Sequence, residues 1–154
     1  MKVQYVDGTD LSQISYAFMR QQDMGMEHMT PNNYLRATAR IYATGEDRLN
    51  FILSLARPFF PIRKDEGGNI VLDPFNNARI NQLSGGQRRM VSIATALFQP
   101  SSLLLLDEPL SGVDSASSEK IVELLRTIAK ENSITILMTL HQVRDALILS
   151  PHLF

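Results

Sequence analysis

The hydrophobic residues in the second half of the chain follow two different periods. Residues 103–106 are four consecutive leucines, and residues 134–140 form a second apolar run rich in β-branched side chains. Short continuous apolar runs are typical of strands covered on both faces of a parallel sheet. Apolar residues also recur at the i, i+3, i+4 and i+7 spacing of two amphipathic helices, namely Met90, Ile93, Ala94 and Leu97 in one and Ile121, Leu124, Leu125 and Ile128 in the other. The order strand, helix, strand predicts an α/β unit with parallel strands.

The first half of the chain holds one further strand pattern and a longer helical region. Apolar and small residues alternate over residues 14–18, which predicts a short strand. Thr30 followed by Pro31 is typical of a helix start, because proline is tolerated at the first helical position. Apolar residues at helical spacing continue until the chain reaches two further prolines. We expect residues 63–69 to form a charged surface turn and residues 73–82 to be irregular and polar.

A polar loop opens the helix that carries Met90. Ser84 is a favourable N-cap, and Gln87 stands three residues later, which is the spacing of a capping box. Gly85 and Gly86 leave the backbone bare at the helix start, where N–H groups and the positive end of the helix dipole attract an anion such as phosphate. A capped helix without any ligand would have the same local sequence.

Two carboxylates follow the leucine strand directly. In open α/β sheets ligands bind at the carboxyl ends of the strands. There Asp107 is suited to hold Mg²⁺, directly or through water, and Glu108 to act on a water molecule as a general base. The plainer interpretation is a strand end followed by a turn at Pro109. His141 comes directly after the next strand, and a lone histidine is more often structural than catalytic.

The two stretches together are more specific than either alone. In their order and spacing they resemble the ABC-transporter ATPase family: residues 83–87 match its LSGGQ signature loop, and residues 103–108 match its Walker B strand with the catalytic glutamate. The resemblance implies that Asp107 holds Mg²⁺ and that Glu108 polarises the attacking water. It also implies that the signature loop binds the γ-phosphate of an ATP held by the opposite subunit, through Ser84, Gly85, Gly86 and Gln87.

Three further positions match loops of the family. Gln21 resembles the Q-loop glutamine, which reaches Mg²⁺ or the attacking water, with Gln22 as the alternative register. Asp114 lies in the D-loop, which touches the opposite subunit and which we group with the cofactor-binding residues. His141 resembles the switch histidine, which contacts the γ-phosphate and the attacking water. Each has a plainer interpretation: a solvated glutamine, a helix N-cap and a structural histidine.

The resemblance implies an α/β fold of the P-loop NTPase type, with a parallel sheet and an inserted helical subdomain. Residues 1–23 would form core strands and the Q-loop, residues 24–100 the helical subdomain with the signature loop, and residues 101–154 the core with Walker B, D-loop and switch histidine. The family's P-loop, G-x-x-x-x-G-K-[ST], holds phosphates through its backbone and lysine, and here no glycine is followed by lysine. We therefore expect residues 1–154 to be a partial ABC ATPase domain, a truncated product or partial gene model that lacks the N-terminal part of the core.

A finer resemblance points to the G subfamily, the eye-pigment and sterol or drug half-transporters. Residues 92–93, 111–115 and 141–142 look like its versions of the family loops. Gln87 departs from this pattern, because the subfamily usually has glutamate there.

Composition removes several alternatives. The 154 residues suit one domain, and the net charge of −1 gives no electrostatic footprint for nucleic acid. No cysteine is present, which excludes disulfides and thiolate metal sites. The resemblance instead implies ATP and Mg²⁺ as cofactors, and two partners: a second nucleotide-binding domain, in a homodimer or heterodimer, and a transmembrane domain outside this chain. The implied location is the cytoplasmic face of a membrane.

The leading hypothesis is ATP binding and hydrolysis coupled to transmembrane transport. The alternative is a non-catalytic regulatory or interaction module that completes a partner's ATP site in trans, or an inert truncated product. A soluble ABC ATPase of DNA repair or translation is a third hypothesis, against which the absence of basic patches counts. The transported substrate is not predicted, because selectivity would lie in membrane helices.

Overall fold

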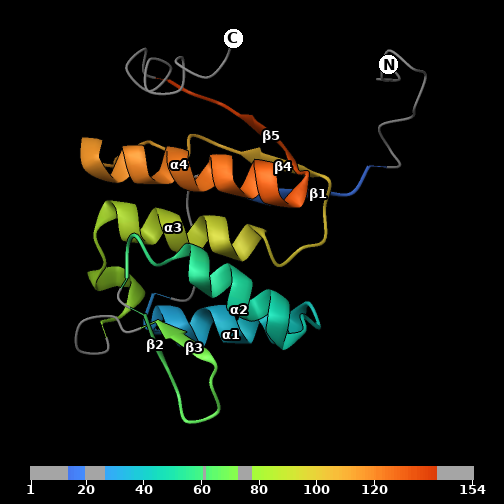
Figure 1. Cartoon of the computed structure of the whole chain (residues 1–154). Helices are drawn as coiled ribbons and strands as arrows, with labels where there is room; N and C mark the ends of the chain where they lie inside the picture. Colours follow the sequence, from blue (N-terminus) through green and yellow to red (C-terminus); the bar gives the residue numbers. More distant parts are fainter. Residues whose placement is uncertain (1–13, 20–26, 61, 73–77, 142–154) are drawn as a thin grey trace.

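The elements of the fold alternate between strands and helices in its second half, as the sequence pattern predicts. The computed structural model describes residues 14–19, 27–60, 62–72 and 78–141. Its elements are β1 (Tyr16–Met19), α1 (Pro31–Ile41), α2 (Glu46–Leu55), β2 (Ile62–Lys64), β3 (Ile70–Leu72), the 3-10 helix η3 (Ile80–Gln82), α3 (Gly85–Ala96), β4 (Leu103–Leu106), α4 (Ser115–Asn132) and β5 (Thr135–Met138). Figure 1 shows the sheet of β1, β4 and β5 packed on α3 and α4, with α1, α2 and the β2–β3 hairpin beyond α3.

The main sheet is parallel, with β4 between β1 and β5. Met19, Leu106 and Met138 stand in register at the carboxyl ends of the three strands. The hydrogen-bond ladder continues one residue further, since the Asp107 N–H donates to the Met19 carbonyl at 3.1 Å and the Thr139 N–H to the Leu106 carbonyl at 3.0 Å. The predicted parallel unit of strand, helix and strand is therefore confirmed, and its strand ends are aligned with one another.

Only one face of this sheet is covered by described residues. Ala17, Leu104 and Leu106 are almost completely buried against the helices. On the opposite face Tyr16, Phe18 and Leu137 are 55%, 46% and 62% exposed; we call these three residues the outer sheet face. The sequence pattern predicted that residues 103–106 and 134–140 are buried on both faces of the sheet. That prediction is wrong for β5 and for the residues of β4 on the same side as the outer sheet face.

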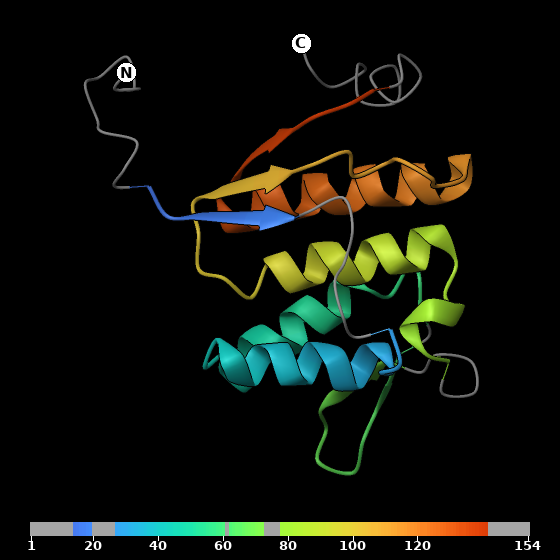
Figure 2. The ribbon, with the colours of Figure 1, turned by 180° about the vertical axis from the view of Figure 1, so that it is seen from behind.

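The helices begin where capping residues stand. The Thr30 hydroxyl accepts the Asn33 N–H at 3.3 Å, and Pro31 is the first residue of α1. Ser84 caps α3 and Asp114 caps α4. Figure 2 shows that α3 and α4 start on the side of the molecule toward which β1 and β4 point. The carboxyl ends of β1 and β4 and the N-termini of α3 and α4 therefore lie on the same side of the molecule.

The β2–β3 hairpin was not predicted. The expected surface turn is present, and the Asp65 carboxylate accepts the N–H groups of Gly67 and Asn69 there at 3.0 and 2.9 Å. Its flanks, however, pair as antiparallel strands, with Ile62 opposite Leu72. Of the stretch expected to be irregular, residues 80–82 form η3, and residues 73–77 lie outside the described residues.

Candidate functional site at the carboxyl edge of the sheet

The centre of the site is a hydrogen-bonded group formed by the residues that follow β4 and β5. The Thr139 hydroxyl donates to Asp107 Oδ1 at 2.8 Å and accepts the Glu108 N–H at 3.0 Å. The polarity of both bonds follows from chemistry, since an ionised carboxylate only accepts and an amide N–H only donates. Thr139 therefore connects the side chain of one candidate residue to the backbone of the next.

Glu108 has an unusual backbone conformation. Its φ is +47°, in the left-handed region that non-glycine residues adopt rarely. Its carbonyl accepts the Ser111 N–H at 3.1 Å, so the backbone is held on both sides. Such a conformation costs on the order of 1–3 kcal/mol and persists where the surroundings fix it, often at functional sites.

The Glu108 carboxylate meets the histidine that follows β5. Glu108 Oε1 lies 2.7 Å from His141 Nε2, which is within hydrogen-bond distance. The Glu108 side chain is 15% exposed, whereas that of His141 is 82% exposed. The structure thus brings together two residues that the sequence analysis singled out independently, with the carboxylate largely shielded and the imidazole open to solvent.

The signature loop forms the predicted capping box at the start of α3. Ser84 Oγ accepts the Gln87 N–H at 3.2 Å, and Gln87 Oε1 accepts the Ser84 N–H at 3.1 Å. The Gln87 amide nitrogen also donates to the Phe59 carbonyl at 3.2 Å, which ties the loop to the segment after α2. Both side chains of the box therefore have structural partners.

The two glycines of the loop pack tightly against the first turn of α4 and the segment before it. A Cβ atom on Gly85 would lie 2.6 Å from the carbonyl oxygen of Gly112, and one on Gly86 would lie 2.6 Å from Ser117 Cβ. Neither glycine has a positive φ, so close approach, rather than backbone conformation, requires them. Buried Arg89 adds a hydrogen bond from Nη2 to the Ser111 carbonyl at 3.2 Å.

Asp114 caps α4 next to this contact. Its carboxylate accepts the Ser117 N–H at 3.0 Å. This hydrogen bond from the Ser117 backbone, supported by the Ser117 hydroxyl, holds the pKa of Asp114 below its ordinary value. The structural interpretation of Asp114 as an N-cap is therefore confirmed in detail.

The predicted residues fall into two groups. Asp107, Glu108 and His141 meet at the sheet edge, whereas Ser84, Gly85, Gly86, Gln87 and Asp114 gather at the N-termini of α3 and α4. Gln21 and Gln22 lie outside the described residues.

Sequence reasoning missed two residues that take part in the hydrogen bonds of the site, Thr139 and Arg89. Thr139 is a polar residue inside an apolar run, two positions before His141, and that interruption was a usable signal. Arg89 follows Arg88 directly after the signature loop, and nothing in the sequence marked Arg89 as the buried one of the two.

Asp107 is suited to a magnesium ion. Mg²⁺ is usually bound through one or two carboxylates together with waters and phosphate oxygens. Thr139 holds one oxygen of Asp107 and thereby fixes the orientation of the carboxylate. Within the residues that the structure describes, no group of three or more His, Asp or Glu side chains forms a complete cage. Asp107 would therefore supply one carboxylate ligand to such an ion.

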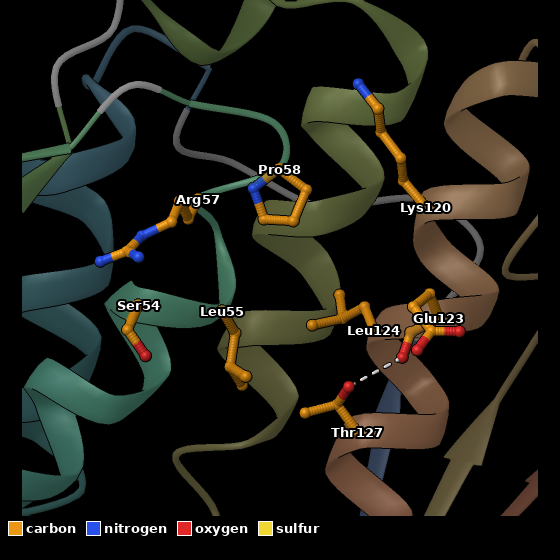
Figure 3. Close-up of a pocket in the computed structure, with 8 residues that line it drawn as sticks. All are labelled: Ser54, Leu55, Arg57, Pro58, Lys120, Glu123, Leu124 and Thr127. Carbon is orange, nitrogen blue, oxygen red and sulfur yellow. Dashed lines mark hydrogen bonds between the residues drawn. The ribbon is translucent and has the colours of Figure 1, made fainter.

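A separate groove lies between the end of α2 and the outer side of α4 (Figure 3). Its volume is about 440 Å³, and its lining residues are Ser54, Leu55, Arg57, Pro58, Lys120, Glu123, Leu124 and Thr127. None of the predicted site residues lines it.

Comparison with known proteins agrees with this geometry. Residues 68–111, which include the signature loop, β4 and Glu108, match the family model for ABC transporters. A phosphonates import ATP-binding protein of Nostoc sp. is 42% identical over 98 residues, covering 58% of this chain and 37% of the relative. Over these stretches the chain is similar to ABC-transporter ATP-binding proteins.

Two further comparisons define the extent of the likeness. The phosphonates import ATP-binding protein of Escherichia coli is 42% identical over 73 residues, covering 47% of this chain and 28% of the relative. The ATP-binding cassette MJ0796, in a dimeric post-hydrolysis state bound to ADP and Pi, superimposes with a TM-score of 0.59 and 26% identity over 88% of this chain and 56% of that chain. The predicted ABC ATPase fold is confirmed. The chain spans well under half the length of the Nostoc and Escherichia coli proteins.

Proposed function

We propose that the chain supplies part of an ATP-hydrolysing site that couples ATP to transport across a membrane. The observation that carries this proposal is the 2.7 Å contact between Glu108 and His141 beside Asp107, at the carboxyl edge of a parallel sheet. The similarity to ABC-transporter ATP-binding proteins supports the same assignment.

Each residue at the sheet edge has a proposed role. Glu108 accepts a proton from the attacking water, for which its carboxylate is well held. His141 donates its ring N–H toward Glu108 or toward the γ-phosphate, and its exposure leaves it accessible to substrate. Asp107 would hold Mg²⁺, which would neutralise charge on the phosphate oxygens when bound. Gln21 is proposed to complete this group from the segment after β1.

The signature loop is proposed to act on a different ATP molecule. The N-terminus of α3 presents N–H groups and the positive end of a helix dipole, a favourable site for phosphate. Ser84, Gly85, Gly86, Gln87 and Asp114 would serve the γ-phosphate of an ATP held by a second nucleotide-binding domain. Dimeric cassettes among the solved structures support such a partner.

The division into domains follows from this proposal. Residues 1–23 and 101–154 would belong to the ATPase core, and residues 24–100 to a helical subdomain that carries the signature loop. We propose a transmembrane domain as the second partner and the cytoplasmic face of the membrane as the location. None of the described helices is both long and apolar enough to cross a bilayer.

The comparisons also bear on the subfamily of the chain. The two phosphonate import proteins favour an importer-type cassette over the G subfamily predicted from residues 92–93, 111–115 and 141–142. Assignment to the G subfamily remains a prediction from those loops alone.

A second candidate function rests on the signature loop alone. As a non-catalytic module, the chain would complete a partner's ATP site in trans without using its own Glu108. The rigid packing of Gly85 and Gly86 against the start of α4 supports a preformed phosphate-facing surface.

One mixing experiment tests the proposal. The chain is combined with a P-loop-containing ABC subunit whose own signature serine is replaced by arginine, and ATP hydrolysis is measured. We expect the chain to restore hydrolysis, Ser84→Arg to abolish it, and Ser133→Arg, at the far end of α4, to leave it unchanged. Restoration that survives Ser84→Arg would contradict the role of the signature loop.

A further inference from the structure

We infer that Thr139 is a positioning residue for the proposed site: its hydroxyl fixes the Asp107 carboxylate and the Glu108 backbone relative to each other. The inference rests on the proposed function for its catalytic meaning. Its structural content stands on the two hydrogen bonds alone, at 2.8 and 3.0 Å.

The position of Thr139 follows from the strand register. Leu106 pairs with Met138, so the residues after them, Asp107 and Thr139, lie side by side at the end of the sheet. The Thr139 N–H donates to the Leu106 carbonyl at 3.0 Å and holds the threonine backbone in the ladder. The side-chain hydroxyl is thus presented from a rigid strand end, and threonine is stiff about χ1 because it is β-branched.

The Thr139 hydroxyl bonds to two groups beyond the strand pairing, the Glu108 N–H and the Asp107 carboxylate. After Asp107 the chain leaves the ladder, and the Glu108 N–H donates to the Thr139 hydroxyl rather than to a strand carbonyl. This bond holds Glu108 at φ +47°, and in that conformation its carboxylate reaches His141. The same hydroxyl donates its proton to Asp107 Oδ1 and thereby fixes that carboxylate. One side chain therefore couples the proposed metal ligand to the proposed general base.

Three variants separate this role from general support of the fold. Thr139→Val keeps the branched shape and removes the hydroxyl, whereas Thr139→Ser keeps the hydroxyl. Thr135→Val makes the same change on an exposed threonine of the same strand, away from the site. Hydrogen–deuterium exchange of the purified chain, resolved at the Glu108 amide, reads the bond without requiring ATP.

We expect Thr139→Val to speed exchange of the Glu108 amide by about twofold to tenfold, the range that a single hydrogen bond of ordinary strength allows. Amides in α3 should not change, Thr139→Ser should restore slow exchange, and Thr135→Val should have no effect at Glu108. Unchanged exchange at Glu108 in Thr139→Val would overturn the inference. Faster exchange throughout the chain, or failure of both Thr139→Val and Thr139→Ala to fold, would also overturn it, because Thr139 would then support the fold as a whole.

The functional readout is ATP hydrolysis at the chain's own Asp107 and Glu108, measured after a P-loop segment of the family has been joined to the N-terminus of the chain. Thr139→Val should lower kcat by about tenfold to a hundredfold through misplacement of the reacting groups, while KM for ATP stays close to the parent value. A rise in KM with unchanged kcat would overturn the positioning role. If this P-loop-bearing parent does not hydrolyse ATP, the proposed function fails, and the exchange measurement still decides whether Thr139 positions Asp107 and Glu108.

Discussion

The Glu108 carboxylate lies 2.7 Å from the ring nitrogen Nε2 of His141, and the two residues follow neighbouring strands of one parallel sheet. The contact is possible because β4 and β5 end in register and because Glu108 turns back through a left-handed backbone conformation. A carboxylate that is largely shielded beside an exposed imidazole is a suitable arrangement for handling the proton of a water molecule.

Replacement of the proposed base should separate hydrolysis from binding. In a version of the chain to which a P-loop segment of the family has been joined at the N-terminus, Glu108→Gln should lower the rate of ATP hydrolysis by about 10²- to 10⁴-fold, because the amide cannot accept the proton. Association that depends on ATP should survive, since glutamine keeps the shape of the side chain. Glu119→Gln, an exposed acid on α4, is the matched control and should keep the parent rate. Glu108→Gln with a rate within a few-fold of the parent would remove Glu108 from its role.

The contact between the signature loop and α4 predicts a stability change. Gly86→Ala places a Cβ 2.6 Å from Ser117 Cβ and 2.7 Å from its Oγ, so the two helix starts must separate. Overpacking of this kind costs about 1–3 kcal/mol in unfolding free energy, measured by thermal or urea unfolding. Gly45→Ser, where no atom lies within 4 Å of the added Cβ, should be close to neutral.

A second variant tests whether this steric contact is the cause. Ser117→Gly removes the atoms that the new methyl group meets, so the double variant Gly86→Ala/Ser117→Gly should lose less stability than the two single changes summed. Strict additivity would show that the two positions do not touch in solution.

The outer sheet face predicts self-association of the purified chain. Tyr16 and Phe18 on β1 and Leu137 on β5 are exposed on the same face of the sheet, with Leu105 of β4 between Phe18 and Leu137. Parallel sheets are ordinarily covered on both faces. We expect oligomers in sedimentation velocity that shift toward monomer in Phe18→Lys, with little loss of stability. Ala17→Lys, on the buried face of the same strand, should instead unfold the chain. A parent chain that sediments as a monomer at all concentrations would contradict the prediction.

The cap of α4 predicts a change in stability at acid pH. The hydrogen bond from the Ser117 N–H lowers the pKa of Asp114, so the fold favours the ionised carboxylate. The resulting stabilisation is complete above the ordinary pKa of about 3.9 and is lost as pH falls through the lowered value. Asn is an equally good N-cap without a charge, so Asp114→Asn should reduce the fall in Tm between about pH 5 and pH 2.

A second carboxylate requires a control in that measurement. The Asn69 N–H, together with the Asn69 side chain, also lowers the pKa of Asp65 in the β2–β3 hairpin. Both proteins should therefore carry Asp65→Asn, so that the difference between them reports Asp114 alone. An equal fall in Tm between about pH 5 and pH 2 in the two proteins would exclude a contribution from Asp114.

Much of the central fold was predictable because its signals are local. Ser84 and Gln87 have the spacing of a capping box, and the four leucines before Asp107 are typical of a buried strand. The meeting of Glu108 with His141 followed from a general rule, since carboxyl ends of parallel strands share one edge.

The remaining features depend on contacts between distant segments. The exposure of Leu137 reflects which face of the sheet the helices cover, and the apolar sequence of β5 does not encode that choice. Thr139 is an ordinary strand residue in sequence, and its role appears only when Asp107 and Glu108 are placed beside it. The hairpin around Gly67 was missed because its strands have only three residues each.

The most direct test of the account is ATP-dependent association between this chain and a P-loop subunit. The partner carries glutamine in place of its catalytic glutamate, so that ATP persists, and its own signature serine is replaced by arginine. Analytical ultracentrifugation with MgATP should show a one-to-one complex that is absent without nucleotide, retained by Glu108→Gln and lost in Ser84→Arg, because bulk and charge then occupy the phosphate-facing end of α3. A complex that forms equally without ATP, or one that tolerates Ser84→Arg, would contradict the assignment of the signature loop to a partner's ATP.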